Sequence, residues 1–183
     1  KERADYLILE INERTIEKGY IEGIPFSIRA LTNIVPKHNT LSYTEEEYVN
    51  IKKSFFKVDD EDDCTCIYTL TEKELLEDLI IQNNKPYKVV SSEYVARVKG
   101  VEEAKIDYML HQGTKEFDSL EGLNFNIKTK TKDVECHTNL IMPFNALNIT
   151  LAYAILDSLG EMEDSKFNQL LEEIKIPGRD EVI

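Results

Sequence analysis

Two short patterns in the sequence have residue types and spacing that could bind a metal ion. Cys64 and Cys66 stand two positions apart and could hold a soft metal, but alternate positions of one strand are the simpler interpretation, which we favour. Asp59 to Asp63 are five consecutive acids, whereas a calcium loop needs ligands at alternating positions around a glycine turn. We therefore predict a strand at the cysteines and a solvated connection at the acids.

The sequence does not contain the usual local motifs of nucleotide binding or hydrolysis. Gly19 and Gly23 are not followed by Lys-Ser or Lys-Thr, and no G-x-G-x-x-G pattern occurs. A serine nucleophile elbow and a His-Glu-x-x-His zinc helix are also missing. The chain by itself therefore lacks a recognisable phosphate cradle, and a hydrolase is disfavoured.

The first half of the chain alternates strand and helix patterns. Tyr6–Ile11 is a continuous apolar run, typical of a parallel strand covered on both faces. Phe26–Ile34 has strand character and is stopped by Pro36. Thr44 and Glu47 form a capping box that opens a helix reaching Phe56.

The second half predicts a mixed sheet. A strand at 66–70, a helix at 72–82 and a strand at 87–90 favour parallel pairing, while alternation at 123–130 and 134–141 indicates antiparallel strands. A buried helix over 144–159 ends before Gly160, and a last helix begins at Asp164 or Ser165 and ends before Pro177. We predict a single α/β domain over residues 1–183, with a largely parallel, mixed sheet flanked by helices.

Composition narrows the class of protein. The chain has 183 residues, a net charge of −13 and 42% hydrophobic residues, which is typical of a folded domain and would repel a nucleic-acid backbone. Three cysteines cannot all pair, which favours a reducing compartment. The absence of a long apolar run and of a signal-peptide start predicts a cytoplasmic protein without a membrane span.

Five segments together resemble the central domain of the Mur ligases, the ATP-dependent amide-bond ligases that add amino acids to the peptidoglycan precursor. They look most like the branch that adds the third residue of the peptide. In chain order the segments are Ala4-Asp-Tyr-Leu-Ile-Leu-Glu10, Leu31-Thr-Asn-Ile34 followed by His38, the set Tyr48, Lys52 and Phe56, Phe144-Asn-Ala-Leu-Asn148, and Ile176-Pro-Gly-Arg-Asp-Glu181.

The resemblance implies a role for six residues. Glu10 and His38 match magnesium ligands, and Lys52 matches the lysine that these ligases carbamylate to hold a second magnesium ion. Asn145 and Asn148 match residues near the adenine of ATP, and Arg179 matches an arginine that contacts the phosphates. The implied cofactors are ATP and Mg²⁺, and the implied substrate is a UDP-sugar peptide or another small molecule; the resemblance leaves the oligomeric state open.

The chain also departs from the family pattern. Lys37 and Thr40 stand where the family has the acids of its Asp-His-x-Asp segment, and Asn12-Glu13-Arg14 replaces Ser-Ser-His. We expect the glycine-rich ATP loop upstream of residue 1 and the amino-acid-selecting domain beyond Ile183, so the chain alone should be inactive. Alternatives are a folate-polyglutamate or cyanophycin-type ligase, or a non-catalytic binding module on the same fold.

Overall fold

A mixed β-sheet forms the centre of the molecule. The computed structural model describes residues 4–35, 43–59, 61–112, 118–119 and 122–175. Within these ranges the sheet has the order β1-β2-β3-β4-β6-β5, with β7 also paired to β6. The first four strands in this order are parallel, and β6 is antiparallel to each of its neighbours. The strands are β1 (Ile28–Leu31), β2 (Thr65–Thr69), β3 (Tyr87–Ser92), β4 (Tyr108–Gln112), β5 (Asp118–Ser119), β6 (Gly122–Thr129) and β7 (Asp133–Thr138).

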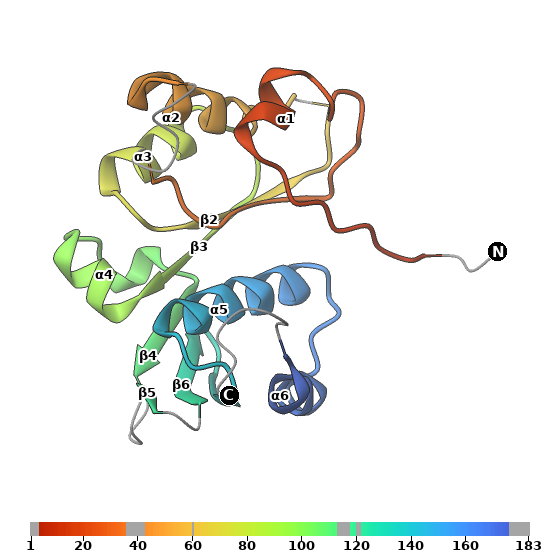
Figure 1. Cartoon of the computed structure of the whole chain (residues 1–183). Helices are drawn as coiled ribbons and strands as arrows, with labels where there is room; N and C mark the ends of the chain where they lie inside the picture. Colours follow the sequence, from red (N-terminus) through yellow and green to blue (C-terminus); the bar gives the residue numbers. More distant parts are fainter. Residues whose placement is uncertain (1–3, 36–42, 60, 113–117, 120–121, 176–183) are drawn as a thin grey trace.

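Helices cover both faces of the sheet (Figure 1). On one face lie α2 (Glu45–Ser54), α3 (Lys73–Ile81) and α4 (Glu93–Val98), and on the other lie α5 (Pro143–Ser158) and α6 (Asp164–Glu173). Along β2, Ile67 packs with α5 whereas Cys66 and Tyr68 pack towards α2 and α3, because successive side chains of a strand point to opposite faces. Burial of β2 on both faces explains why the sequence predicts an apolar strand here. The helices on both faces of the sheet confirm the α/β fold class.

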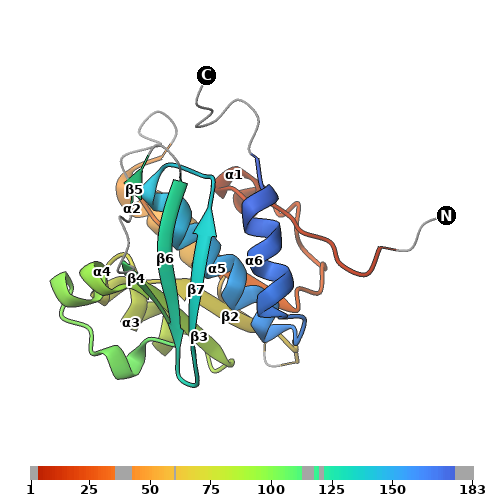
Figure 2. The same cartoon turned by 90° about the horizontal axis from the view of Figure 1, so that it is seen from below.

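The longest described helix, α5, crosses the sheet behind the β6–β7 hairpin, and α6 lies beside β7 (Figure 2). Helix α5 has buried residues on several sides, as its predicted apolar sequence requires, and it ends at Ser158, two residues before Gly160, whose φ of +74° suits a residue that follows a helix. No helix among the described residues has the length and apolar character needed to span a bilayer.

Helix α2 begins at the predicted capping box. The Thr44 hydroxyl accepts a hydrogen bond from the Glu47 amide at 3.2 Å, and the Glu47 carboxylate accepts one from the Thr44 amide at 2.7 Å. These bonds satisfy two backbone donors that the helix itself leaves unpaired. The backbone bond from Thr44 is the largest cause that lowers the pKa of Glu47.

We expect Thr44→Ala to lower the free energy of unfolding by about 1 kcal/mol, because it removes the hydroxyl acceptor at the start of α2. Urea denaturation followed by circular dichroism measures the change. Thr44→Ser keeps the oxygen and should retain most of the stability. An equal loss in both variants would show that the cap is not the cause.

The strand predicted at Tyr6–Ile11 is wrong. These residues form no strand, and the side chains of Leu7 and Ile8 are 78% and 93% exposed. An apolar strand needs neighbours that pair with it and layers that cover it, and the described sheet provides neither for this segment. In Figure 1 the segment reaches the body of the molecule as a coil. The short helix α1 (Glu13–Glu17) follows it, capped by the Asn12 side chain.

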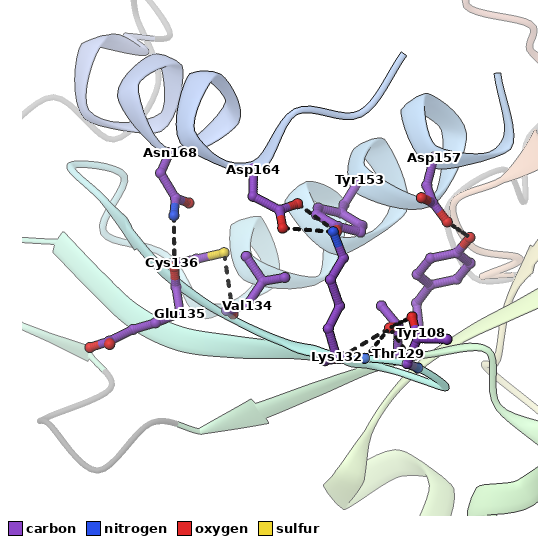
Figure 3. A network of polar contacts seen from close by, with 11 residues as sticks. Tyr108, Thr129, Lys132, Val134, Glu135, Cys136, Tyr153, Asp157, Asp164 and Asn168 are labelled. Carbon is purple, nitrogen blue, oxygen red and sulfur yellow. Dashed lines mark hydrogen bonds and ion pairs between the residues drawn. The ribbon is translucent and has the colours of Figure 1, made fainter. Parts of the chain in front are cut away.

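A polar network ties the β6–β7 hairpin and β4 to the two helices on their face (Figure 3). Lys132, in the hairpin turn, donates to Asp164 at 2.6 Å, and the Tyr153 hydroxyl of α5 donates to the same carboxylate at 2.8 Å. The Tyr108 hydroxyl of β4 donates to Asp157 of α5 at 2.6 Å. These contacts fix α5 across the sheet and the start of α6 beside the hairpin.

The Lys132–Asp164 contact predicts a pH dependence of stability. The hydrogen bond from Lys132 and then that from Tyr153 lower the pKa of Asp164 against the opposing effect of burial. A carboxyl with a lowered folded-state pKa stabilises the fold above its unfolded pKa of about 4, and this contribution is lost as the pH falls through the folded value. Because 35% of the Asp164 side chain is exposed, solvent screening limits the contribution to about 1 kcal/mol.

We therefore expect Asp164→Asn to lower the free energy of unfolding by about 1 kcal/mol at pH 7, and the difference from the parent chain to shrink below about pH 4. Urea denaturation at a series of pH values measures it. Asp133→Asn, at an exposed position of β7, is the control. A difference that stays constant down to pH 2 would contradict this account.

Candidate active site

The carboxyl ends of the four parallel strands lie along one edge of the sheet, which is where ligands bind in open α/β folds. Thr32 and Asn33 follow β1, and both are exposed. Thr69 closes β2, Glu93 follows β3, and His111 lies near the end of β4. This edge is the candidate site.

Five buried side-chain polar atoms among the described residues have no hydrogen-bond partner, and three of them lie at this edge: Thr69 Oγ1, Thr71 Oγ1 and His111 Nε2. Thr69 and Thr71 line a small hollow between the end of β2 and α3. A buried polar group without a partner costs about 1–3 kcal/mol, so these atoms suit a ligand that would satisfy them. These residues were not predicted from the sequence, although polar residues at the ends of two buried strands were the available signal.

His111 is oriented by a carboxylate. Its Nδ1 lies 3.1 Å from Glu93 Oε2, at the start of α4. An ionised carboxylate only accepts, so Nδ1 carries the proton and a neutral ring leaves Nε2 as an acceptor. Neither residue had a role predicted from the sequence.

Lys52 lies on α2 beside α1. Its Nζ is 3.7 Å from Glu13 Oε2 and 5.7 Å from the centroid of the Tyr48 ring. The side chains of Lys52 and Glu13 are each 18% exposed, so this is a largely buried ion pair. Glu13 belongs to the Asn12-Glu13-Arg14 segment, which departs from the family pattern. The structure thus places a carboxylate next to the predicted carbamylation site.

The predicted magnesium ligand Glu10 is exposed and lies in the coil before α1. Its predicted position at the tip of a strand is wrong, because the preceding apolar run does not join the described sheet. His38, the second predicted ligand, and its neighbours Lys37 and Thr40 lie outside the described residues. A shared cation between Glu10 and His38 therefore stays a prediction.

The two predicted adenine contacts differ in exposure. Asn145 and Asn148 lie three residues apart at the start of α5, but Asn145 is buried and Asn148 is exposed. The Asn145 backbone amide donates to Met142 O at 2.8 Å within the first turn. Asn148 is thus the one open to a ligand. Arg179, the predicted phosphate contact, lies outside the described residues.

The prediction of one strand through both cysteines is correct only for Cys66, which lies in β2. Cys64 immediately precedes Thr65, the first residue of that strand, and both cysteines are buried. The described part of the chain contains no group of three or more His, Cys, Asp or Glu side chains that could hold a metal ion. The acidic connection is exposed at Asp59, Glu61 and Asp63, as predicted.

Comparison with known proteins identifies the fold and the relatives. The family model of the Mur ligase middle domain matches residues 1–156. UDP-N-acetylmuramoyl-L-alanyl-D-glutamate–2,6-diaminopimelate ligase of Fusobacterium nucleatum is 21% identical over 183 residues, 100% of this chain and 34% of the ligase. The ligase of the same name from Buchnera aphidicola is 39% identical over 56 residues, which are 31% of this chain and 11% of that protein.

Solved structures give the same fold. A UDP-N-acetylmuramoyl-L-alanyl-D-glutamate–2,6-diaminopimelate ligase superposes with a TM-score of 0.74 at 18% identity, over 94% of this chain and 33% of that one. Folylpolyglutamate synthase from Thermotoga maritima superposes with a TM-score of 0.59 at 16% identity, over 85% of this chain and 32% of that one. The chain thus spans about a third of these proteins. Because the family model covers most of its residues, the chain belongs to the Mur ligase family and carries the middle domain of that family.

Proposed function

We propose that this domain, in the intact protein, serves ATP-dependent formation of an amide bond on a peptidoglycan precursor. ATP phosphorylates a substrate carboxylate, and an amine then attacks the acyl phosphate to give an amide, ADP and phosphate. The observation that carries the proposal is the match of the Mur ligase middle domain to residues 1–156. The names of the relatives favour a UDP-N-acetylmuramoyl dipeptide as the acceptor and 2,6-diaminopimelate as the amine.

A carbamate at Lys52 would stand beside the Glu13 carboxylate, which lies 3.7 Å from Lys52 Nζ, and the two would offer oxygens to a divalent cation. Glu10, exposed in the coil before α1, would join them as the family resemblance implies. Carbamylation joins the Lys52 amine nitrogen to the carbon of CO₂. The ammonium group loses two protons in all, one to free the amine and one as the N–C bond forms, and the cation becomes an anion. Carboxylate and carbamate oxygens are the hard ligands that Mg²⁺ prefers. Mg²⁺, when bound, neutralises charge on the transferring phosphoryl group.

The remaining proposed roles concern ATP. Asn148 offers an exposed amide at the start of α5 that can both donate to and accept from the adenine. Arg179 would contact the phosphates and His38 would complete the cation site, as the family resemblance implies. Asn145 is buried and would act by holding the first turn of α5 in place. These residues bind and orient the nucleotide, and positioning provides most of the catalysis in phosphoryl transfer.

The net charge of −13 supports small-molecule partners rather than nucleic acid. The three cysteines are free thiols in the structure, which supports a reducing, cytoplasmic location.

One observation favours a second candidate, a non-catalytic binding module. Lys52 already has a carboxylate partner in Glu13, so it can stay an ammonium ion without a metal. The replacement of the family's acids by Lys37 and Thr40 also favours a non-catalytic module. Turnover of ATP to ADP distinguishes a ligase from a binding module.

The test mixes the intact protein with ATP, Mg²⁺, UDP-N-acetylmuramoyl-L-alanyl-D-glutamate and 2,6-diaminopimelate, and measures ADP release. We expect release that depends on both the acceptor and the amine. A parallel arm with a folate acceptor and glutamate tests the folate-type alternative. Absence of ADP release in both arms would overturn the ligase proposal and favour the binding module.

A further inference from the structure

Lys52 of α2 and Glu13 of α1 form an ion pair that is largely shielded from solvent. Lys52 Nζ lies 3.7 Å from Glu13 Oε2, and each side chain is only 18% exposed. An ammonium group and a carboxylate attract each other strongly in such a place, because little water can screen their charges. The two groups together are electrically neutral.

Local structure places the Glu13 carboxylate against α2. Glu13 is the first residue of α1, and the Asn12 side chain caps this helix by accepting from the Thr15 amide at 3.0 Å. At the other end of α1, Glu17 Oε2 accepts from the Tyr43 hydroxyl at 2.9 Å, close to the start of α2. Helix α1 contains no buried residue, so its position depends on polar contacts of this kind.

The surroundings of Lys52 Nζ suit a positive charge better than a negative one. The Tyr48 ring, whose centroid is 5.7 Å away, presents the electron-rich face that attracts a cation. The next lysine of the helix, Lys53, is directed to Asp78 of α3, at 2.7 Å. Carbamylation of Lys52 would therefore place an anion beside a carboxylate and an aromatic face.

Carbamylation also removes the charge balance of the site. The Lys52 ammonium and Glu13 sum to zero, whereas a carbamate and Glu13 carry two negative charges in the same largely buried space. Unpaired charge is costly where solvent is excluded. One divalent cation restores neutrality, and both groups offer it the oxygen ligands that Mg²⁺ prefers.

We propose, on the basis of the carbamylation step in the proposed function, that Glu13 makes carbamylation of Lys52 conditional on a bound divalent cation. In this step the N–C bond forms, and the ammonium group releases two protons to solvent. CO₂ and Mg²⁺ then bind cooperatively, and because such coupling is reciprocal, each raises the affinity for the other by the same factor. Glu13 lies in a segment that departs from the family pattern, so the coupling is a property of this chain.

Carbon-13 NMR of the intact protein in ¹³C-labelled bicarbonate, with and without Mg²⁺, tests the proposal. We expect at least about tenfold less carbamate at Lys52 when Mg²⁺ is absent. Calorimetric titration with Mg²⁺ should show binding that is tighter by the same factor in bicarbonate than in CO₂-free buffer. Lys52→Arg identifies the signal, because arginine does not form the carbamate.

Two substitutions in α1 separate the role of Glu13 from a general effect of charge. Glu13→Gln leaves the Lys52 ammonium without its carboxylate and removes the repulsion of the carbamate, so the Mg²⁺ dependence should fall to about twofold or less. Glu17→Gln is the matched control. It removes the same charge from the same helix, but Glu17 contacts Lys18 and Tyr43, so the Mg²⁺ dependence should stay as in the parent protein.

The outcomes distinguish this proposal from the proposed function. Full carbamylation without Mg²⁺, or an unchanged Mg²⁺ dependence in Glu13→Gln, would overturn the coupling through Glu13 alone. Absence of carbamate under every condition would overturn it together with the carbamylation step. Carbamate that depends on Mg²⁺, in a protein that releases no ADP, would support the coupling and count against the ligase function only.

Discussion

Gly122→Ala is expected to lower the free energy of unfolding by about 3 kcal/mol. Gly122 opens β6 with a φ of +127°, a conformation that costs an L-residue about 1–3 kcal/mol. A Cβ atom at this position would overlap the backbone carbonyl of Thr138, the last residue of β7. Overlap with a packed backbone adds about 1–3 kcal/mol, and the smaller entropy of the unfolded alanine chain offsets only part of the cost.

The hairpin cannot move away to make room for the added methyl group. The Thr138 hydroxyl donates to Leu171 O of α6 at 3.0 Å, and it accepts from the Leu140 amide on the path to α5. Gly100→Ala is the matched control: its φ is +64°, but a Cβ there meets nothing within 4 Å, so we expect a loss of about 1 kcal/mol. Urea denaturation compares the two, and equal losses would contradict the close approach.

Local sequence patterns correctly predicted those helices and strands whose defining pattern lies within a few consecutive residues. The Thr44–Glu47 capping box fixed the start of α2, and the succession of strand, helix and strand over β2, α3 and β3 was correct. Tyr6–Ile11 failed because burial of an apolar strand depends on neighbours that are distant in sequence. Helices α1 and α4 were missed because five or six residues carry too little periodicity to recognise.

The candidate site was predicted in part. The family resemblance singled out Lys52, but its pairing with Glu13 depends on how α1 packs against α2, which no local pattern records. The Thr69, Thr71 and His111 edge follows from parallel pairing, since only that pairing brings the ends of β2 and β4 to one side. Polar residues at the ends of predicted parallel strands are a sequence signal that would have identified this edge of the sheet without the structure.

Lys52→Ala in the intact protein is expected to lower kcat for ADP release by about 10²–10³-fold, the usual cost of removing one group that stabilises charge in the transition state. The reason, under the proposed ligase function, is loss of the carbamate that together with Glu13 forms the anionic site. Because the Lys52–Glu13 pair is largely buried, the variant should also lose about 1–3 kcal/mol of stability, so kcat is measured where circular dichroism shows the variant to be folded.

Lys53→Ala is the matched control for this experiment. Lys53 is the next residue of the same helix, its side chain is 14% exposed, and its Nζ pairs with Asp78 Oδ2 at 2.7 Å. It faces α3 instead of α1, so removing its charge should leave kcat within about twofold, and because the Asp78 side chain is 56% exposed the loss of stability should be at most about 1 kcal/mol. If the two variants turned over ATP at the same rate, Lys52 would be a structural lysine held by Glu13, and the anionic site would have to be sought at the strand ends around Thr69 and His111.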